Sequence, residues 1–182
     1  MHGIMFTQLE KYVCDTMGVE VWQSVLKEAG RTAGTVFLED SEYVDGDLLG
    51  LISATTLVTN RTADDILQAL GTFLVPDLIR TYQSAIDPTW RSLDLFENTE
   101  NKIHTAVRSR NPGASPPMLA MTRVSPTQVN LIYSSPRQLC AIAKGIAHGV
   151  ARHYSEEITI TETACMHHGA ADCRISFVLL QP

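Results

Sequence analysis

The sequence predicts an α+β fold, in which a mainly helical part is followed by a four-stranded antiparallel sheet with one inserted helix (β-β-α-β-β). Up to about residue 107 apolar residues recur at helical spacing, and beyond residue 118 they recur at every second position. The segment between, Asn111-Pro112-Gly113-Ala114-Ser115-Pro116-Pro117, cannot continue a helix. We expect one domain over 1–182, with a helical lobe at 1–110 and an α/β lobe at 111–182.

Five helices are expected before the proline loop. Glycines Gly18 and Gly30 bound the first two. Thr62, followed by two aspartates, is a plausible N-cap for the fourth, and Pro76 should kink or end it. The fifth begins after Asp87-Pro88. The expected helices cover about 9–17, 21–26, 47–58, 62–74 and 89–107.

The alternating pattern after the loop predicts a hairpin of strands at 119–123 and 129–133, turned by Ser125-Pro126-Thr127. A helix rich in small residues is expected at 138–153. Two further strands are expected at 158–165 and 173–180, which completes the four-stranded sheet.

Composition restricts the class of protein. Hydrophobic residues make up 45% and charged residues 19% of the chain, so disorder is not expected. A net charge of −6 argues against a nucleic-acid partner. The N-terminal residues lack the charged region and long apolar core of a signal peptide, so we expect a soluble cytoplasmic protein. At 182 residues no separate output domain fits beside this one.

Two sets of side chains are candidates for binding a ligand. Tyr133, Ser135 and Arg137 share one side if the strand continues through them. Two hydroxyls and a guanidinium suit an apolar ligand with two carboxylates or phosphates, as haem propionates provide; a solvated strand end is the alternative. His104 borders the apolar face of the fifth helix. Its imidazole can bind iron, although a lone helix histidine is usually an ordinary residue.

Taken together, these features resemble the haem nitric oxide/oxygen binding (H-NOX) family, which includes the haem domain of soluble guanylate cyclase. The resemblance implies that His104 is the proximal ligand of a b-type haem between the two parts of the fold. It implies that Pro117 distorts the porphyrin, although a loop-stiffening role is the alternative, and that the Tyr-x-Ser-x-Arg motif binds the propionates. It covers nearly the whole chain and rests on the Met-x-Gly start, Trp22, Gly71-Thr72-Phe73, His104, Pro117, Tyr133, Ser135 and Arg137.

The expected distal side of this haem is apolar. Family members that bind O₂ stably carry a tyrosine a few residues after the propionate arginine, whereas here that position falls on or near Ile142 and 138–152 contains no tyrosine. Without a hydrogen-bond donor the pocket favours NO and CO over O₂. NO weakens the bond opposite it, so release of His104 is the expected switch. The expected lining is Ile4, Met5, Leu74 and Ile142; Tyr12, Tyr43 or Tyr82 could still enter from elsewhere.

Three of the four cysteines lie late in the chain, which is too few for a disulfide framework. Cys140, Cys165 and Cys173 resemble the thiolates of a zinc-containing bacterial H-NOX subset. The fourth ligand of that subset is a histidine, and here its position holds Glu162. Glu162, His167 or His168 could complete a tetrahedral site, whereas the alternatives are disulfides or small buried residues.

The expected function is therefore a haem-based NO sensor without enzymatic activity, since no nucleophile constellation or phosphate-binding loop is present. The resemblance to stand-alone bacterial members implies regulation of a histidine kinase or a cyclic-di-GMP enzyme (a diguanylate cyclase or phosphodiesterase). Two alternatives stay open. One is a module that binds another acid without haem, and the other is a cysteine/zinc redox sensor in which haem is secondary.

Overall fold

The computed structural model describes residues 1–180 and confirms the α+β class, with helices and a four-stranded antiparallel sheet. It divides into two compact units, 1–70 and 71 onward. This boundary differs from the lobe boundary expected at the proline loop. The change of hydrophobic period marks where strands begin, whereas the helices after residue 71 already pack against those strands. None of the helices within 1–180 has the length and apolar character needed to cross a bilayer.

The first unit contains three helices and the start of a fourth, close to the expected ranges. Gly18 separates the first two with a φ of 103°, a conformation that favours glycine, and its N–H bonds to carbonyls of the preceding helix. The buried rings of Phe6, Trp22 and Phe37 form part of the core, and the partly exposed Tyr43 packs against Phe6 and Phe37. The helices are α1 (Ile4–Met17), α2 (Val19–Glu28), α3 (Asp45–Thr59) and α4 (Ala63–Thr81).

Helix α4 begins as expected and ends later than expected. Thr62 caps it, because its Oγ accepts the Asp65 N–H at 3.1 Å. Pro76 does not end the helix, which continues to Thr81. Its second half is held by close packing on α7 (Cys140–His153), where a Cβ at Gly71 would collide with the Ile142 carbonyl. This packing compensates for the hydrogen bond that Pro76 cannot donate.

The expected fifth helix is built from three consecutive segments. These are α5 (Ser92–Asn98), the π-helical η2 (Thr99–His104) and α6 (Thr105–Arg110), and a short 3₁₀ turn, η1 (Gln83–Ala85), precedes them. Periodicity places the helix correctly and cannot show the wider π-helical turn. Such turns occur mostly as single insertions and often at functional sites.

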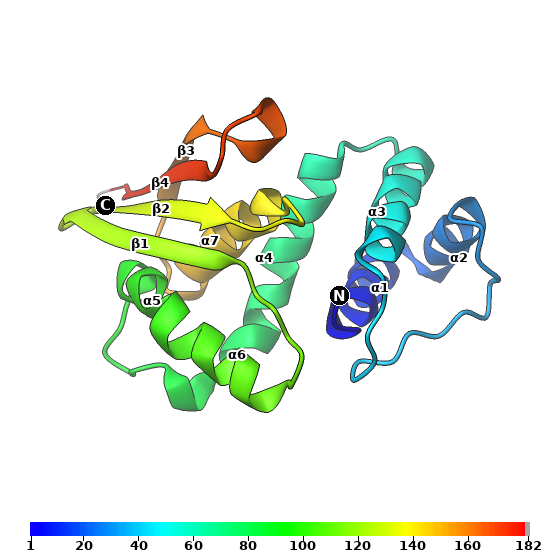
Figure 1. The fold of residues 1–182 in the computed structure, drawn as a ribbon, viewed down its shortest axis with the longest axis horizontal. Coiled ribbons are helices and arrows are strands. Elements are labelled where there is room, and N and C mark those ends of the chain that lie inside the picture. Colours follow the sequence, from blue (N-terminus) through cyan, green and yellow to red (C-terminus); the bar gives the residue numbers. More distant parts are fainter. Residues whose placement is uncertain (181–182) are drawn as a thin grey trace. The chain divides into compact units, whose positions relative to one another are not determined.

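The sheet contains β1 (Met118–Ser125), β2 (Gln128–Ser134), β3 (Ile158–Ala164) and β4 (Cys173–Leu179) in the order β1-β2-β4-β3 (Figure 1). All pairings are antiparallel, and β1 and β2 form the expected hairpin. A 3₁₀ turn, η3 (Met166–His168), joins β3 to β4. The buried face of the sheet packs against α5 and α7. Leu119, Tyr133 and Cys173 are register partners and form one row across three strands.

Candidate functional site

His104 is the last residue of the π-helical segment η2, and its side chain is 12% exposed. Its Nδ1 lies 2.8 Å from a carboxylate oxygen of Glu100. Burial lowers the pKa of His104, and hydrogen bonds to Glu100 and to the Pro117 backbone oppose that shift only in part. The neutral imidazole is therefore favoured, which is the form that binds metal ions.

The Glu100 carboxylate binds three groups. Oε2 lies 2.8 Å from His104 Nδ1 and accepts the Leu119 N–H at 3.2 Å, while Oε1 accepts from Arg108 Nη2 at 2.6 Å. Burial raises the pKa of Glu100, but hydrogen bonds from Arg108 and His104 outweigh it and hold the pKa below its ordinary value. Glu100 is thus an anion that links the His104 segment to the start of β1. Glu100 was not predicted from the sequence, although a carboxylate four residues before a histidine on a helix lies close enough to bond to it.

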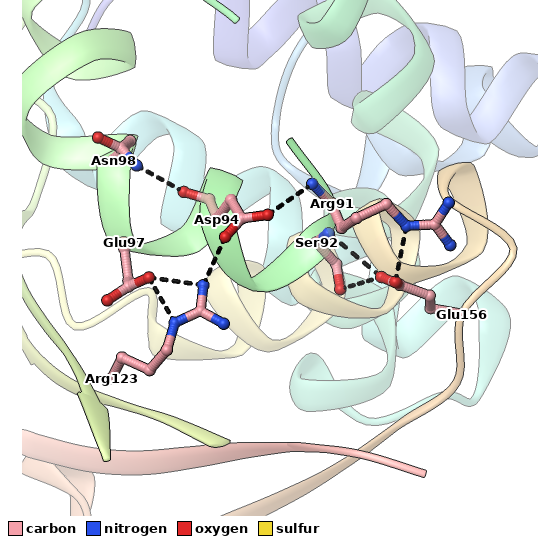
Figure 2. A network of polar contacts seen from close by, with 7 residues as sticks. All are labelled: Arg91, Ser92, Asp94, Glu97, Asn98, Arg123 and Glu156. Carbon is pink, nitrogen blue, oxygen red and sulfur yellow. Dashed lines mark hydrogen bonds and ion pairs between the residues drawn. The ribbon is translucent and has the colours of Figure 1, made fainter. Parts of the chain in front are cut away.

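The helix leading to His104 is anchored at its beginning by Glu156, beyond the end of α7 (Figure 2). Its Oε1 accepts from Arg91 Nε at 2.9 Å, and its Oε2 accepts from both the N–H and the hydroxyl of Ser92. The fully buried Ser92 side chain therefore has a charged partner. Burial raises the pKa of Glu156, and the hydrogen bonds from Ser92 and Arg91 overcome this and lower it.

A second anchor joins α5 to β1 (Figure 2). Arg123 donates from Nε to Glu97 at 2.6 Å and from Nη2 to Asp94 at 2.7 Å. Asp94 also accepts the Arg91 N–H at 2.9 Å through its other oxygen, and its backbone carbonyl accepts from Asn98. The two anchors together tie α5 to the sheet and to the segment after α7.

The Tyr-x-Ser-x-Arg residues meet in a turn rather than along a strand. β2 ends at Ser134, so strand alternation places only Tyr133. The hydroxyl of Ser135 bonds to the Tyr133 side chain and accepts the Arg137 N–H at 3.3 Å. Tyr133 and Ser135 are 2% and 4% exposed, and burial raises the pKa of Tyr133. Hydrogen bonds therefore bring these residues together, in place of the alternation that the sequence suggested.

Arg137 connects this turn to the proline loop. Its Nη1 donates to the Ser115 carbonyl at 2.6 Å, two residues before Pro117, which directly precedes β1. The second unit also places Leu74 on α4 and Ile142 on α7, and both side chains are buried. Ile4 and Met5 begin α1 in the first unit and are partly exposed.

The three late cysteines form one buried cluster. Cys140 Sγ lies 3.9 Å from Cys165 Sγ, and Cys173 Sγ lies 3.8 Å from Cys165 Sγ, so the thiols are unbridged. Burial raises the pKa of Cys140 and of Cys165. Among residues 1–180 the ligand atoms of these cysteines and Glu162 all lie within 4.8 Å of one another.

Glu162 is the fourth member of this cluster. Its Oε2 pairs with Lys144 Nζ at 3.3 Å, whereas its Oε1 is buried and has no hydrogen-bond partner within the described part of the chain. His167 instead places Nε2 2.7 Å from the Gln138 carbonyl, and His168 lies exposed in η3. Of the three residues that the sequence left open, the structure therefore brings only Glu162 to the thiols. Three thiolates and a carboxylate are a donor set that Zn²⁺ accepts.

Solved structures of other proteins share the fold of this chain. An H-NOX protein from S. oneidensis in the Fe(II)NO ligation state is 28% identical over 100% of both chains, with a TM-score of 0.90. The Fe(II)CO form of an H-NOX domain from Shewanella oneidensis is also 28% identical over 100% of both chains, with a TM-score of 0.86. An unliganded H-NOX protein from K. algicida shares the fold at 19% identity, with a TM-score of 0.89 over 100% of this chain and 98% of that one.

A comparison with curated protein sequences gives no significant match. The sequence model of the family described as haem-NO-binding, in contrast, matches residues 2–162. A match of this extent includes the His104 segment, the proline loop and the Tyr-x-Ser-x-Arg turn. This chain therefore belongs to the haem-NO-binding, or H-NOX, family, whose fold is that of a haem-based gas sensor.

Proposed function

We propose that this protein is a cytoplasmic NO sensor that binds a b-type haem through His104 and has no catalytic activity of its own. The observation that carries the proposal is the partly buried His104, whose side chain is 12% exposed and whose Nδ1 is already bonded to Glu100. Nε2 is then the nitrogen for the iron. Bound haem would supply a ferrous iron that takes up diatomic gases.

The remaining residues would orient the cofactor. Tyr133, Ser135 and Arg137 would bind the propionates, and Pro117 adjoins the strand that Glu100 contacts. Bound haem would supply the iron that takes up NO, and loss of the bond to His104 would free the imidazole and the segment that carries it to shift against β1. We propose this release as the signal.

A preference for NO and CO over O₂ requires that no tyrosine hydroxyl donate a hydrogen bond to the bound gas. Helix α7 contains none. The hydroxyl of Tyr12 accepts from Arg61 at 3.0 Å and that of Tyr43 accepts the Leu38 N–H at 2.8 Å. The hydroxyl of Tyr82 accepts from Asn111 at 3.3 Å. Each hydroxyl accepts a bond from a partner within its own unit, and the absence of tyrosine from α7 supports a distal side without a donor for O₂.

Anaerobic absorbance spectra of the haem-loaded ferrous protein test this proposal. We expect a five-coordinate ferrous spectrum that shifts with NO and forms no stable complex in air. His104→Ala should abolish that spectrum, whereas His148→Ala, which removes an exposed histidine from α7, should preserve it. Failure to take up haem would favour the acid-binding module, and a stable oxy form would contradict the distal side described above.

The cysteine cluster supports a second proposal, that Cys140, Cys165, Cys173 and Glu162 bind one structural zinc ion. The orphaned Glu162 Oε1 is the observation that favours it, because a buried oxygen without a partner is costly. Bound zinc would neutralise the thiolates. Three buried, unbridged thiols also suit a reducing compartment, which supports the cytoplasmic location.

Metal analysis of the purified protein tests the zinc site. We expect one zinc per chain, loss of that zinc in Cys165→Ser, and its retention in Cys14→Ser, which changes the cysteine outside the cluster. Wild-type protein without zinc but with a disulfide among these cysteines would favour the redox sensor instead. In that case oxidation, rather than NO, should change the output.

We propose a histidine kinase or a cyclic-di-GMP enzyme as the bacterial partner. The support is the resemblance to stand-alone family members, and no residue of this chain identifies the enzyme. Kinase or cyclase assays of candidate partners with the NO-bound and NO-free protein would test it. An output that is the same in both states would contradict regulation by NO.

A further inference from the structure

Glu100 joins the His104 segment to two other elements of the fold. Its side chain is 29% exposed, yet its two oxygens bind groups from three places in the fold. One is the imidazole of His104, four residues along the π-helical segment. Another is Arg108 on α6, and the last is the Leu119 N–H at the start of β1. The carboxylate is thus fixed from the strand side and the helix side at once.

We infer that Glu100 is a positioning residue for His104, which sets the strength of the bond between the imidazole and the haem iron. This inference rests on the proposed function, since it requires His104 to be the iron ligand. A carboxylate that accepts the Nδ1–H fixes the tautomer, so that Nε2 carries the lone pair. It also makes the imidazole more basic and hence a stronger electron donor to the metal.

The other two contacts of Glu100 determine how strongly it acts. The Leu119 N–H shares Oε2 with His104 and keeps that oxygen next to Nδ1. Arg108 binds Oε1 at 2.6 Å and withdraws negative charge from the carboxylate. The effect on His104 is therefore smaller than that of an isolated carboxylate. It follows that Arg108→Gln should strengthen the iron–imidazole bond, whereas changes at Glu100 should weaken it.

A stronger bond to His104 also opposes its release. Glu100 would then set how readily NO frees the imidazole. Loss of a carboxylate partner from a metal-bound histidine typically changes metal binding by about 10- to 100-fold. We expect His104 release after NO binding to be about tenfold faster, or more, when the carboxylate is removed.

Resonance Raman spectroscopy of the ferrous haem protein measures this bond directly through the iron–histidine stretching frequency. We expect that frequency to fall in Glu100→Gln, because a neutral amide oxygen is a weaker acceptor, and to fall further in Glu100→Ala. It should rise in Arg108→Gln. Stopped-flow mixing with NO should show faster conversion to the five-coordinate NO complex in the two Glu100 variants.

Glu97→Gln is the matched control, because it removes the same charge from the same helix at a carboxylate that binds Arg123 instead of His104. Its frequency should equal that of the wild type. An unchanged frequency in both Glu100 variants, with haem bound and His104 still required, would overturn the inference. Spectra that do not depend on His104 would instead overturn the proposed function. Glu100→Gln keeps a side chain of the same shape and decides the question if Glu100→Ala fails to fold.

Discussion

The His104 region and the cysteine cluster lie at two ends of one row across the sheet, yet they satisfy their polar groups in opposite ways. Leu119, which donates to Glu100, is the register partner of Tyr133, and Tyr133 is the partner of Cys173. Around His104 the imidazole and both carboxylate oxygens of Glu100 have protein partners. In the cluster the buried Oε1 of Glu162 has none among residues 1–180.

This difference separates two kinds of site. The His104 region is organised by its own hydrogen bonds, so its geometry does not require a bound group. The cluster crowds three thiols against a carboxylate, and an unsatisfied buried oxygen costs about 1–3 kcal/mol. A metal ion would relieve that cost, so the cluster is expected to depend on its ligand for stability and the His104 region is not.

Substitution of Glu162 should have the largest effect on this contrast. Glu162→Ala removes one of the four proposed ligands, and we expect zinc affinity to fall by at least about tenfold. Glu162→His offers a nitrogen at the same position and should retain zinc. Competition with a chromophoric chelator measures both affinities.

Thermal unfolding with and without zinc gives the corresponding stabilities. The zinc-loaded wild type should be more stable than zinc-loaded Glu162→Ala. The zinc-free forms should differ less in stability, because the Glu162 carboxylate then has no metal ion to bind. Equal zinc affinities in wild type and Glu162→Ala would remove Glu162 from the site and leave its buried oxygen unexplained.

A smaller effect is expected where α5 is anchored to β1. Arg123→Gln removes the ion pairs to Asp94 and Glu97, and the Arg123 side chain is 27% exposed, so solvent screens both. We expect the free energy of unfolding to fall by about 1 kcal/mol, measured by urea denaturation. Zinc content should not change. Arg174→Gln breaks an ion pair with Asp172 in which the arginine is more exposed, and it should lower the free energy of unfolding by less. An equal loss in both variants would mean that the Arg123 pairs stabilise the fold no more than an exposed ion pair does.

The sequence was sufficient for the type and order of the helices and strands. The spacing of apolar residues and the positions of glycine and proline located the helices and strands, because each element buries one face. The β1–β2 hairpin has the turn that was expected. It was not sufficient where an outcome depends on packing. Pro76 fits inside α4 because Gly71 and Gly149 allow close contact with α7, and no local pattern shows a contact so distant in the chain.

The partners of the site residues were harder to predict for the same reason. The sequence identified His104 but not Glu100, since a glutamate on a helix is usually a solvated charge and its contact with Leu119 crosses from helix to strand. It left Glu162, His167 and His168 open as ligands. Only the fold decides among them, because β3 points Glu162 toward the thiols while η3 turns His167 toward the Gln138 carbonyl.

The smallest expected effect is a pH dependence of the other α5 anchor. The pKa of Glu156 lies below its ordinary value of 4.5, so the contacts with Ser92 and Arg91 stabilise the folded state fully above pH 4.5. This contribution is lost as the pH falls through the lowered, folded-state value. Glu156→Gln should therefore be less stable than wild type near neutral pH, and the gap should narrow in acid. Urea denaturation between about pH 3 and pH 7 measures it.

Glu157→Gln removes the same charge from the adjacent, exposed position and serves as the control. A gap between wild type and Glu156→Gln that stays constant with pH would mean that Ser92 binds a neutral side chain as well as a charged one. Anchoring of α5 would then rest on shape and hydrogen bonding alone. A gap that narrows would show that charge holds the beginning of the helix that carries His104.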